Sequence, residues 1–153
     1  MSSGPPEVVR TLAQVETHSP EETMAFGREL AKEVPPPCVV LLEGELGSGK
    51  TTLVKGLVAG LGAAREEDVT SPSFTLVHEY GSAGKVYHVD LYRIEDGREL
   101  GTLGLDELEA AETTIFVEWG EKLGHNVPTP CIRIRLEHLG SDDRRIVVER
   151  VET

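Results

Sequence analysis

One short segment has the residue types and the spacing of a phosphate-binding loop. Gly44-Glu45-Leu46-Gly47-Ser48-Gly49-Lys50-Thr51 matches the pattern G-x-x-x-x-G-K-[ST] at every fixed position. Glycines let the backbone curl so that its N–H groups face phosphate oxygens, and the positive end of the following helix adds to this attraction. We expect Lys50 to reach the β- and γ-phosphates and the Thr51 hydroxyl to ligate Mg²⁺. The predicted nucleotide-binding residues of this segment are Glu45, Leu46, Gly47, Ser48, Gly49, Lys50, Thr51 and Thr52.

Two acidic residues follow strand-like runs elsewhere in the chain. Asp90 ends "VYHVD" and Glu118 ends "TIFVE". A phosphate-loop site needs a carboxylate at a strand end to hold Mg²⁺ or its waters, so Asp90 and Glu118 are candidate metal-binding and catalytic residues, together with Lys50. The structural alternative is that Asp90 caps a helix and that Glu118 is a solvated strand end. Two such acids in one phosphate-loop domain favour the functional interpretation.

The segment "TSPSF", residues 70–74, is a candidate sensor of the γ-phosphate. It offers the hydroxyls of Thr70, Ser71 and Ser73 beside the stiffening Pro72. Its position between the phosphate-loop helix and the next strand is where nucleotide switches place such a loop. An ordinary Ser/Pro turn explains the same residues equally well. Thr70 is therefore added to the candidate nucleotide-binding residues with both interpretations open.

Several residues near these motifs have a structural role as their default. His88, two residues before Asp90, is expected to be a packed or cross-strand histidine rather than a catalytic one. Core packing is favoured for Trp119 over a position beside the nucleotide. The C-terminal arginines predict a solvated strand face, with a phosphate or partner contact as the less favoured alternative; they are Arg133, Arg135, Arg144 and Arg145.

Helix and strand signals flank the phosphate loop. Ser19 as N-cap, Pro20 in the first turn and Glu22 as capping-box partner predict the start of a helix, which the prolines at 35–37 end. The apolar run at 38–42 is typical of a strand buried on both faces. After the loop, a second helix is predicted, with Gly62 as its C-cap. Its apolar stripe consists of Leu53, Val54, Leu57, Val58 and Leu61.

The remaining patterns complete an α/β fold. They predict a β-hairpin in residues 73–92 and one or two short helices in residues 95–112. A buried strand is predicted at 114–119 and a second hairpin at 131–151. The predicted fold class is a P-loop NTPase-like three-layer domain with a mixed, mainly parallel sheet and antiparallel edge hairpins. We expect residues 1–153 to form a single domain, of which 1–7 are a frayed end.

Composition limits the partners of this protein. The 153 residues carry a formal net charge of −12, and such a surface repels free nucleic acid, whose phosphates bind clustered Lys and Arg. Cys38 and Cys131 have no metal-ligand spacing and are expected to be buried free thiols in a reducing compartment. No signal-peptide h-region and no membrane-spanning stretch is found in the sequence, so we expect a cytoplasmic protein without a membrane partner.

Taken together, the motifs resemble the bacterial TsaE (YjeE) ATPase family. "GELGSGKTTLVKGL", "TSPSFTLVHEY", "YHVDLYRI" and "VEWGEKL" occur in the order and rough spacing of that family. The resemblance runs from about Ser19 to the C-terminal hairpin. Many families share the phosphate loop, whereas the combination of "TSPSFTLV", H-x-D-L-Y-R and "VEW" is far more specific.

The resemblance implies a role in making N6-threonylcarbamoyladenosine in certain tRNAs. Members of the family hydrolyse ATP weakly alone and act while docked on the TsaB–TsaD pair, to which TsaC supplies threonylcarbamoyl-adenylate. The implied ligands are ATP and Mg²⁺, and tRNA is contacted only indirectly. By the same resemblance, Glu118 is the second metal-site acid, Asp90 lies near the metal and the attacking water, and Thr70 and Ser71 belong to the switch-like loop.

Two other functions remain as alternatives. A small-molecule kinase needs a substrate pocket and usually an Arg-bearing lid, and the chain has no obvious lid insertion. A GTP-dependent switch module usually carries an N-K-x-D segment, which is absent from this sequence.

Overall fold

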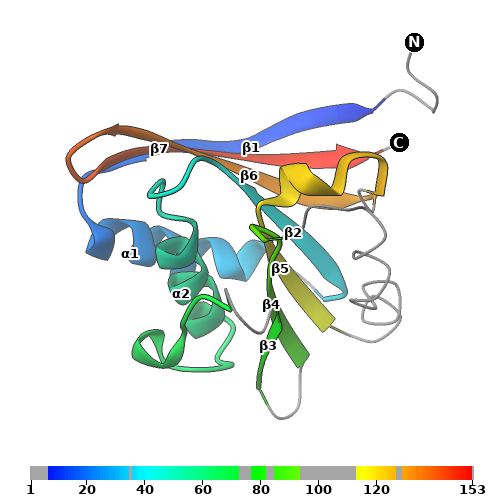
Figure 1. Ribbon diagram of the computed structural model, residues 1–153, viewed down its shortest axis with the longest axis horizontal. Helices are drawn as coiled ribbons and strands as arrows, with labels where there is room; N and C mark the ends of the chain where they lie inside the picture. The colour runs from blue at the N-terminus through cyan, green and yellow to red at the C-terminus, as the bar shows by residue number, and fades with distance from the viewer. Residues whose placement is uncertain are drawn as a thin grey trace.

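Seven strands form one mixed sheet in the computed structural model, which describes residues 7–34, 36–72, 77–81, 85–93, 113–126 and 129–152. The strand order is β1-β7-β6-β2-β5-β4-β3. The strands are β1 (Val8–Thr17), β2 (Cys38–Glu43), β3 (Val77–Tyr80), β4 (Lys85–Asp90), β5 (Thr113–Glu118), β6 (Cys131–Gly140) and β7 (Asp143–Glu152). Figure 1 shows β1, β7 and β6 lying together along one side of the molecule.

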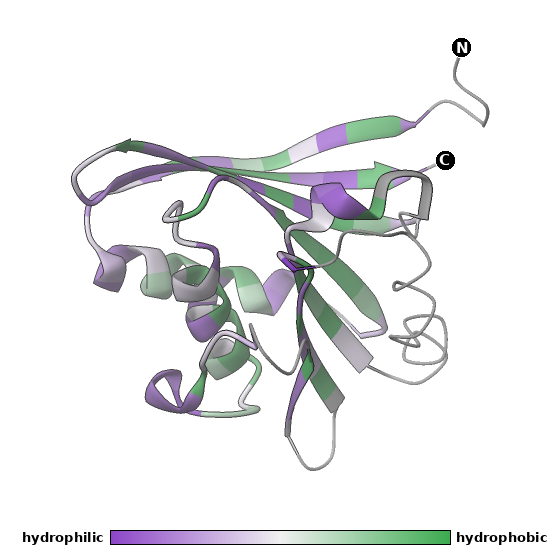
Figure 2. Cartoon of the chain, viewed as in Figure 1, coloured by the Kyte–Doolittle hydropathy of each residue, from purple (hydrophilic) through white to green (hydrophobic). Residues whose placement is uncertain are grey.

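The centre of the sheet is parallel and its flanks are antiparallel. β2 pairs in parallel with both β5 and β6, and β5 pairs in parallel with β4. β2 and β5 are buried along most of their length, as their continuous apolar runs predict, and β2 is hydrophobic along most of its length in Figure 2. β6–β7 and β3–β4 are the two predicted antiparallel hairpins. The predicted α/β fold class is therefore confirmed.

The sheet also contains one strand that the sequence patterns did not predict. β1 pairs with β7 along its length, with a shift of register between Thr11 and Ala13. Most of its side chains are exposed, including Val8 and Leu12. Its first five residues are all exposed, and only the second half alternates, with Ala13 and Val15 half-buried and Thr17 buried. Pairing with β7 and the packing of Ala13 and Val15 against the core favour its extended conformation.

Two helices cover one face of the sheet, α1 (Pro20–Leu30) and α2 (Lys50–Gly60). Ser19 Oγ accepts the Glu22 N–H at 3.1 Å, as predicted for the N-cap. The Glu22 carboxylate accepts the N–H of His18 at 3.0 Å instead of that of Ser19, so the capping box reaches one residue further back than expected. A short 3₁₀ helix, η1 (Ala31–Glu33), follows α1.

The two helices pack unusually closely. A Cβ placed on Gly56 of α2 would lie 2.1 Å from the carbonyl oxygen of Met24 in α1. The C-cap of α2 is Leu61, and the predicted residue, Gly62, follows it with φ of +74°; the N–H of Ala63 bonds to Val58 O at 3.2 Å. The larger apolar core lies between these helices and the sheet, around Phe116, Leu42 and Leu57.

The other face of the sheet carries a second apolar cluster. It contains Leu41, Ile115 and Val117 together with Leu123 of the 3₁₀ turn η3 (Gly120–Asn126). The short helices predicted for 95–112 lie outside the described residues. Cys131 is buried and Cys38 is half-buried, and both are free thiols. Among the helices that the structure describes, none is long and apolar enough to cross a membrane.

Candidate functional site

The phosphate-loop segment connects the end of β2 to the start of α2. Gly44, Gly47 and Gly49 have φ of +155°, +81° and +100°, values that glycine adopts without a steric penalty. A cavity of about 480 Å³ opens beside the loop. It is lined by Leu46, Gly47, Gly49, Lys50, Thr51, Thr52, Ser71, Asp90, Tyr92, Arg93, Glu118, Trp119 and Arg144.

The Lys50 ammonium lies inside the curl of the loop. Nζ donates to Gly44 O at 2.5 Å and to Glu45 O at 3.0 Å. It also lies 4.1 Å from the centre of the Trp119 ring, a cation–π distance. Burial lowers the pKa of Lys50, while the charges of Glu118, Glu121 and Asp90 act in the opposite direction. The loop therefore holds its cation in a desolvated position, where an anionic ligand would be strongly attracted.

Thr51 and Glu118 are in direct contact across the cavity. Thr51 Oγ1 lies 3.0 Å from Glu118 Oε1 and 2.9 Å from Oε2, so its hydroxyl donates to the carboxylate. His88 Nε2 also hydrogen-bonds to Glu118 Oε2. His88 is fully buried and Glu118 is 3% exposed. The carboxylate is thus fixed between the first turn of α2 and the neighbouring strand β4.

Asp90 lies beside Glu118 because β4 and β5 are parallel and in register, with the two residues paired. Its Oδ2 accepts the Ser71 hydroxyl at 3.1 Å, and its Oδ1 accepts the Tyr92 N–H at 2.9 Å. Asp90 therefore links the end of β4 to the segment that contains Ser71. This arrangement puts two carboxylates and one candidate sensor residue at the same end of the sheet.

The structure brings most of the predicted site residues to one cavity. Leu46, Gly47, Gly49, Lys50, Thr51, Thr52, Asp90 and Glu118 line it. Glu45, Ser48 and Thr70 do not. Glu45 contributes its carbonyl to Lys50, and Ser48 is buried behind the loop. Thr70 bonds through its main chain to the side chains of Tyr80 and His78.

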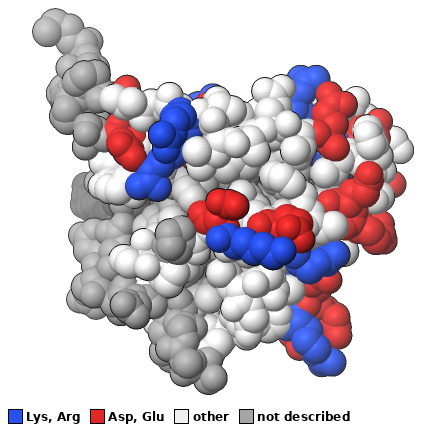
Figure 3. Space-filling view, turned by 180° about the vertical axis from the view of Figure 1, so that it is seen from behind, with Lys and Arg blue, Asp and Glu red and all other residues white. Residues whose placement is uncertain are grey.

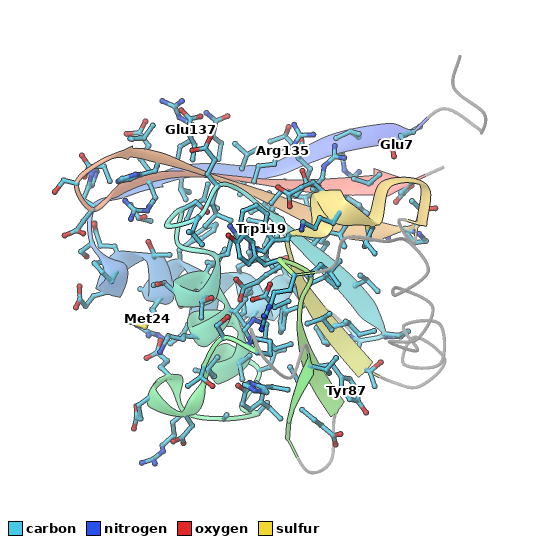
Figure 4. All side chains as sticks on the ribbon, viewed as in Figure 1. Glu7, Met24, Tyr87, Trp119, Arg135 and Glu137 are labelled. Atoms are coloured by element: carbon cyan, nitrogen blue, oxygen red, sulfur yellow. The ribbon has the colours of Figure 1, made fainter. Side chains whose placement is uncertain are left out.

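Three residues have a closer relation to the site than sequence reasoning assigned to them. His88 is packed, as expected, but its partner is the site carboxylate of Glu118. Trp119, which is labelled in Figure 4, lines the cavity, and its ring centre lies 5.0 Å from that of Tyr92. Arg144 is half-buried rather than solvated and donates to Gly47 O at 3.1 Å.

Two of these three have a signal in the sequence, since Trp119 directly follows the candidate acid Glu118. His88 and Asp90 are two apart on one strand, so they share a face of the sheet. No local pattern distinguishes Arg144 from its neighbour Arg145.

The oxygen donors of the site suit a hard cation. Magnesium prefers oxygen ligands and is usually held by one or two carboxylates together with substrate phosphates. The Thr51 hydroxyl and the Glu118 carboxylate supply protein oxygens side by side. Within the described residues, no group of three His, Cys, Asp or Glu could hold a metal ion unaided. The residues present therefore fit a cation that shares its coordination with a bound phosphate.

Comparisons with known proteins agree on one family. A family model described as threonylcarbamoyl adenosine biosynthesis protein TsaE matches residues 17–146. The chain is similar to the tRNA threonylcarbamoyladenosine biosynthesis protein TsaE of Bacillus subtilis, with 40% identity over 136 residues, which are 88% of this chain and 84% of the relative. Its identity to the protein of the same name from Aquifex aeolicus is 36% over 141 residues, or 91% of this chain and 97% of the relative. The crystal structure of YdiB from Bacillus subtilis has a similar fold, with a TM-score of 0.74, 33% identity and coverage of 94% of this chain and 87% of that one.

Proposed function

The chain belongs to the TsaE family of threonylcarbamoyl adenosine biosynthesis proteins, and we propose that it is an ATPase that supports formation of N6-threonylcarbamoyladenosine in tRNA. The observation that carries the proposal is the contact between Thr51 of the phosphate loop and the buried carboxylate of Glu118, with Asp90 paired to Glu118 on the next strand. The phosphate loop, the oxygens of Thr51 and Glu118, and the second acid Asp90 therefore face the same cavity.

ATP binds with its β- and γ-phosphates against the loop amides and Lys50. Water attacks the γ-phosphorus in line, and the bond from that phosphorus to the β–γ bridging oxygen breaks, giving ADP and inorganic phosphate. Asp90 orients the water, because its position beside Ser71 puts it at the sensor loop. Lys50 moves from the carbonyls of Gly44 and Glu45 to the phosphates, where its charge stabilises the transition state.

Thr51 and Glu118 are the residues that would hold Mg²⁺ together with the phosphate oxygens. A cation held there would neutralise charge that develops on the transferred phosphoryl group. His88 keeps the Glu118 carboxylate in one orientation through the hydrogen bond to Oε2. Second partners of this kind commonly fix a metal-site carboxylate in place.

In this proposal, ATP hydrolysis changes the state of a partner complex. We propose that the chain docks on the TsaB–TsaD pair in the cytoplasm and contacts tRNA only indirectly. The charge of −12 supports this division of labour, because a polyanion gains little from such a surface. On the described part of the face in Figure 3, basic side chains lie next to acidic ones instead of forming an extended basic patch.

The proposal is tested by ATP turnover of the purified protein with and without purified TsaB and TsaD. Turnover should rise when the pair is added, and the protein should co-purify with it. Lys50→Ala should abolish the stimulated turnover and lower the modified-tRNA content of cells that depend on this chain. Unchanged turnover and unchanged tRNA in the Lys50→Ala variant would refute the function.

A further inference from the structure

Arg144 is a cation at the nucleotide cavity that the mechanism above does not use. It lies in the second position of β7, beside the turn that joins β6 to β7. Its Nη2 donates to Gly47 O in the phosphate loop at 3.1 Å. Its Nη1 donates to the carbonyls of Ser141 at 2.9 Å and of Asp143 at 3.0 Å. One guanidinium therefore ties the phosphate loop to the C-terminal hairpin.

The hydrogen bonds of Arg144 leave its charge without a counter-ion. All three acceptors are main-chain carbonyls, and no ion pair of Arg144 with Asp or Glu is found in the part of the chain that the structure describes. The next residue shows the contrast, because Arg145 pairs with Glu16 at 3.3 Å and with Glu137 at 3.7 Å. Alternation along β7 turns the two side chains to opposite faces of the sheet.

The surroundings of Arg144 make this charge costly. The side chain is half-buried, and its Nε is buried without a hydrogen-bond partner among the described residues. The same Nε lies 3.6 Å from the position of a Cβ on Gly49, so the guanidinium runs along the loop. A partly desolvated cation with no neutralising group is unfavourable on its own, and an anion in the adjoining cavity would relieve the cost.

The order of the strands indicates which part of a bound nucleotide would face Arg144. β2, which leads into the phosphate loop, separates β5 and β4 from β6 and β7. Asp90 and Glu118 end β4 and β5 on one side, and Arg144 enters the cavity from the other. If the acids mark the γ-phosphate and metal end, as the proposed function requires, Arg144 lies toward the phosphates that ADP and ATP share.

From these observations, we propose that Arg144 is a second phosphate-binding cation of this site. It supplies positive charge to the α- and β-phosphates of the nucleotide while it holds Gly47 in place. The inference rests on the proposed function for its ligand, a nucleoside polyphosphate, but it does not require that the nucleotide be hydrolysed.

The test compares three variants by calorimetric binding of ADP and of ATP. Arg144→Gln keeps an amide that can donate to carbonyls but removes the charge, Arg144→Lys keeps the charge, and Arg145→Gln is the matched control on the opposite face. Arg144→Gln should weaken ADP and ATP by the same factor, about tenfold, which is at the low end for a charge-assisted hydrogen bond. Arg144→Lys should restore most of the affinity, and Arg145→Gln should bind as the wild type.

Thermal unfolding of each variant separates a binding role from a structural one. We expect Arg144→Gln and Arg144→Lys to melt close to each other, while their affinities differ. Wild-type affinity in Arg144→Gln, or equal weakening by Gln and Lys, would overturn the charge role. Weaker binding of ATP but not of ADP by Arg144→Gln would overturn the assignment to the phosphates that both nucleotides share. Nucleotide binding by the wild type without partner-stimulated turnover would refute the proposed ATPase function and leave the Arg144 result standing.

Discussion

Replacing Glu118 by glutamine should separate nucleotide binding from nucleotide hydrolysis. The substitution conserves the shape of the side chain and one acceptor oxygen. The Thr51 hydroxyl, which lies 3.0 and 2.9 Å from the two carboxylate oxygens, therefore keeps one of its two acceptors. A lost hydrogen bond to a charged group costs about 1.5–3 kcal/mol, and the fold should survive. The carboxylate is only 3% exposed, so the lost charge is not replaced by water. We therefore expect a loss of about 100- to 1,000-fold in kcat, the range for removal of one preorganised electrostatic group.

The assay measures phosphate release in the presence of TsaB and TsaD, with ATP and ADP affinities measured by calorimetry. Glu121→Gln is the matched control, since Glu121 is exposed and accepts the Gly44 N–H at 3.3 Å without lining the cavity beside the phosphate loop. Its turnover should fall by less than about tenfold, as expected for one surface hydrogen bond. Glu118→Gln turnover within threefold of wild type, in a variant that unfolds at the wild-type temperature, would refute the assignment of Glu118.

Other perturbations test the fold and the supporting residues. Gly56→Ala should lower the free energy of unfolding in urea by about 2 kcal/mol despite its better helix propensity, because the added Cβ meets Met24 O; a more stable variant would contradict the helix packing. His88→Phe should reduce Mg²⁺-dependent turnover at least about tenfold, because Glu118 loses the partner that orients it, while the affinity for ATP without metal is retained. His88→Gln should recover part of the turnover. Equal turnover in the two variants would exclude the positioning role. Burial raises the pKa of Cys38 and of Cys131 to about 11, so iodoacetamide should label the native thiols slowly at pH 8 and faster toward pH 11. Since the folded state keeps these protons longer than the unfolded chain, stability should fall as the pH rises from about 9 through 11; native labelling at pH 8 as fast as in urea would contradict the burial.

Much of the site was predictable because its parts are encoded locally. The phosphate loop is a run of eight residues in which glycine spacing, Lys50 and Thr51 specify the backbone and predict a phosphate ligand. The buried strand before it and the amphipathic helix after it show their own periodicity. Asp90 and Glu118 were recognisable because each ends a strand-like run. The motif combination also predicted the family to which the chain belongs.

Contacts between distant segments were decided only by the tertiary structure. Arg144 meets Gly47 across 97 positions of sequence, and Arg145, of the same type and next in the chain, faces the other way. His88 bonds to Glu118 because β4 and β5 lie side by side in register. The extended conformation of residues 8–17 likewise depends on pairing with β7.

The sequence alone therefore determined the phosphate loop, its flanking elements and the two acids, since each depends on backbone geometry and side-chain chemistry over a few residues. The partners of those acids, and the second cation beside the loop, depended on the order and register of the strands. Local patterns specify which face of a strand a residue occupies, but they do not specify which strand becomes its neighbour.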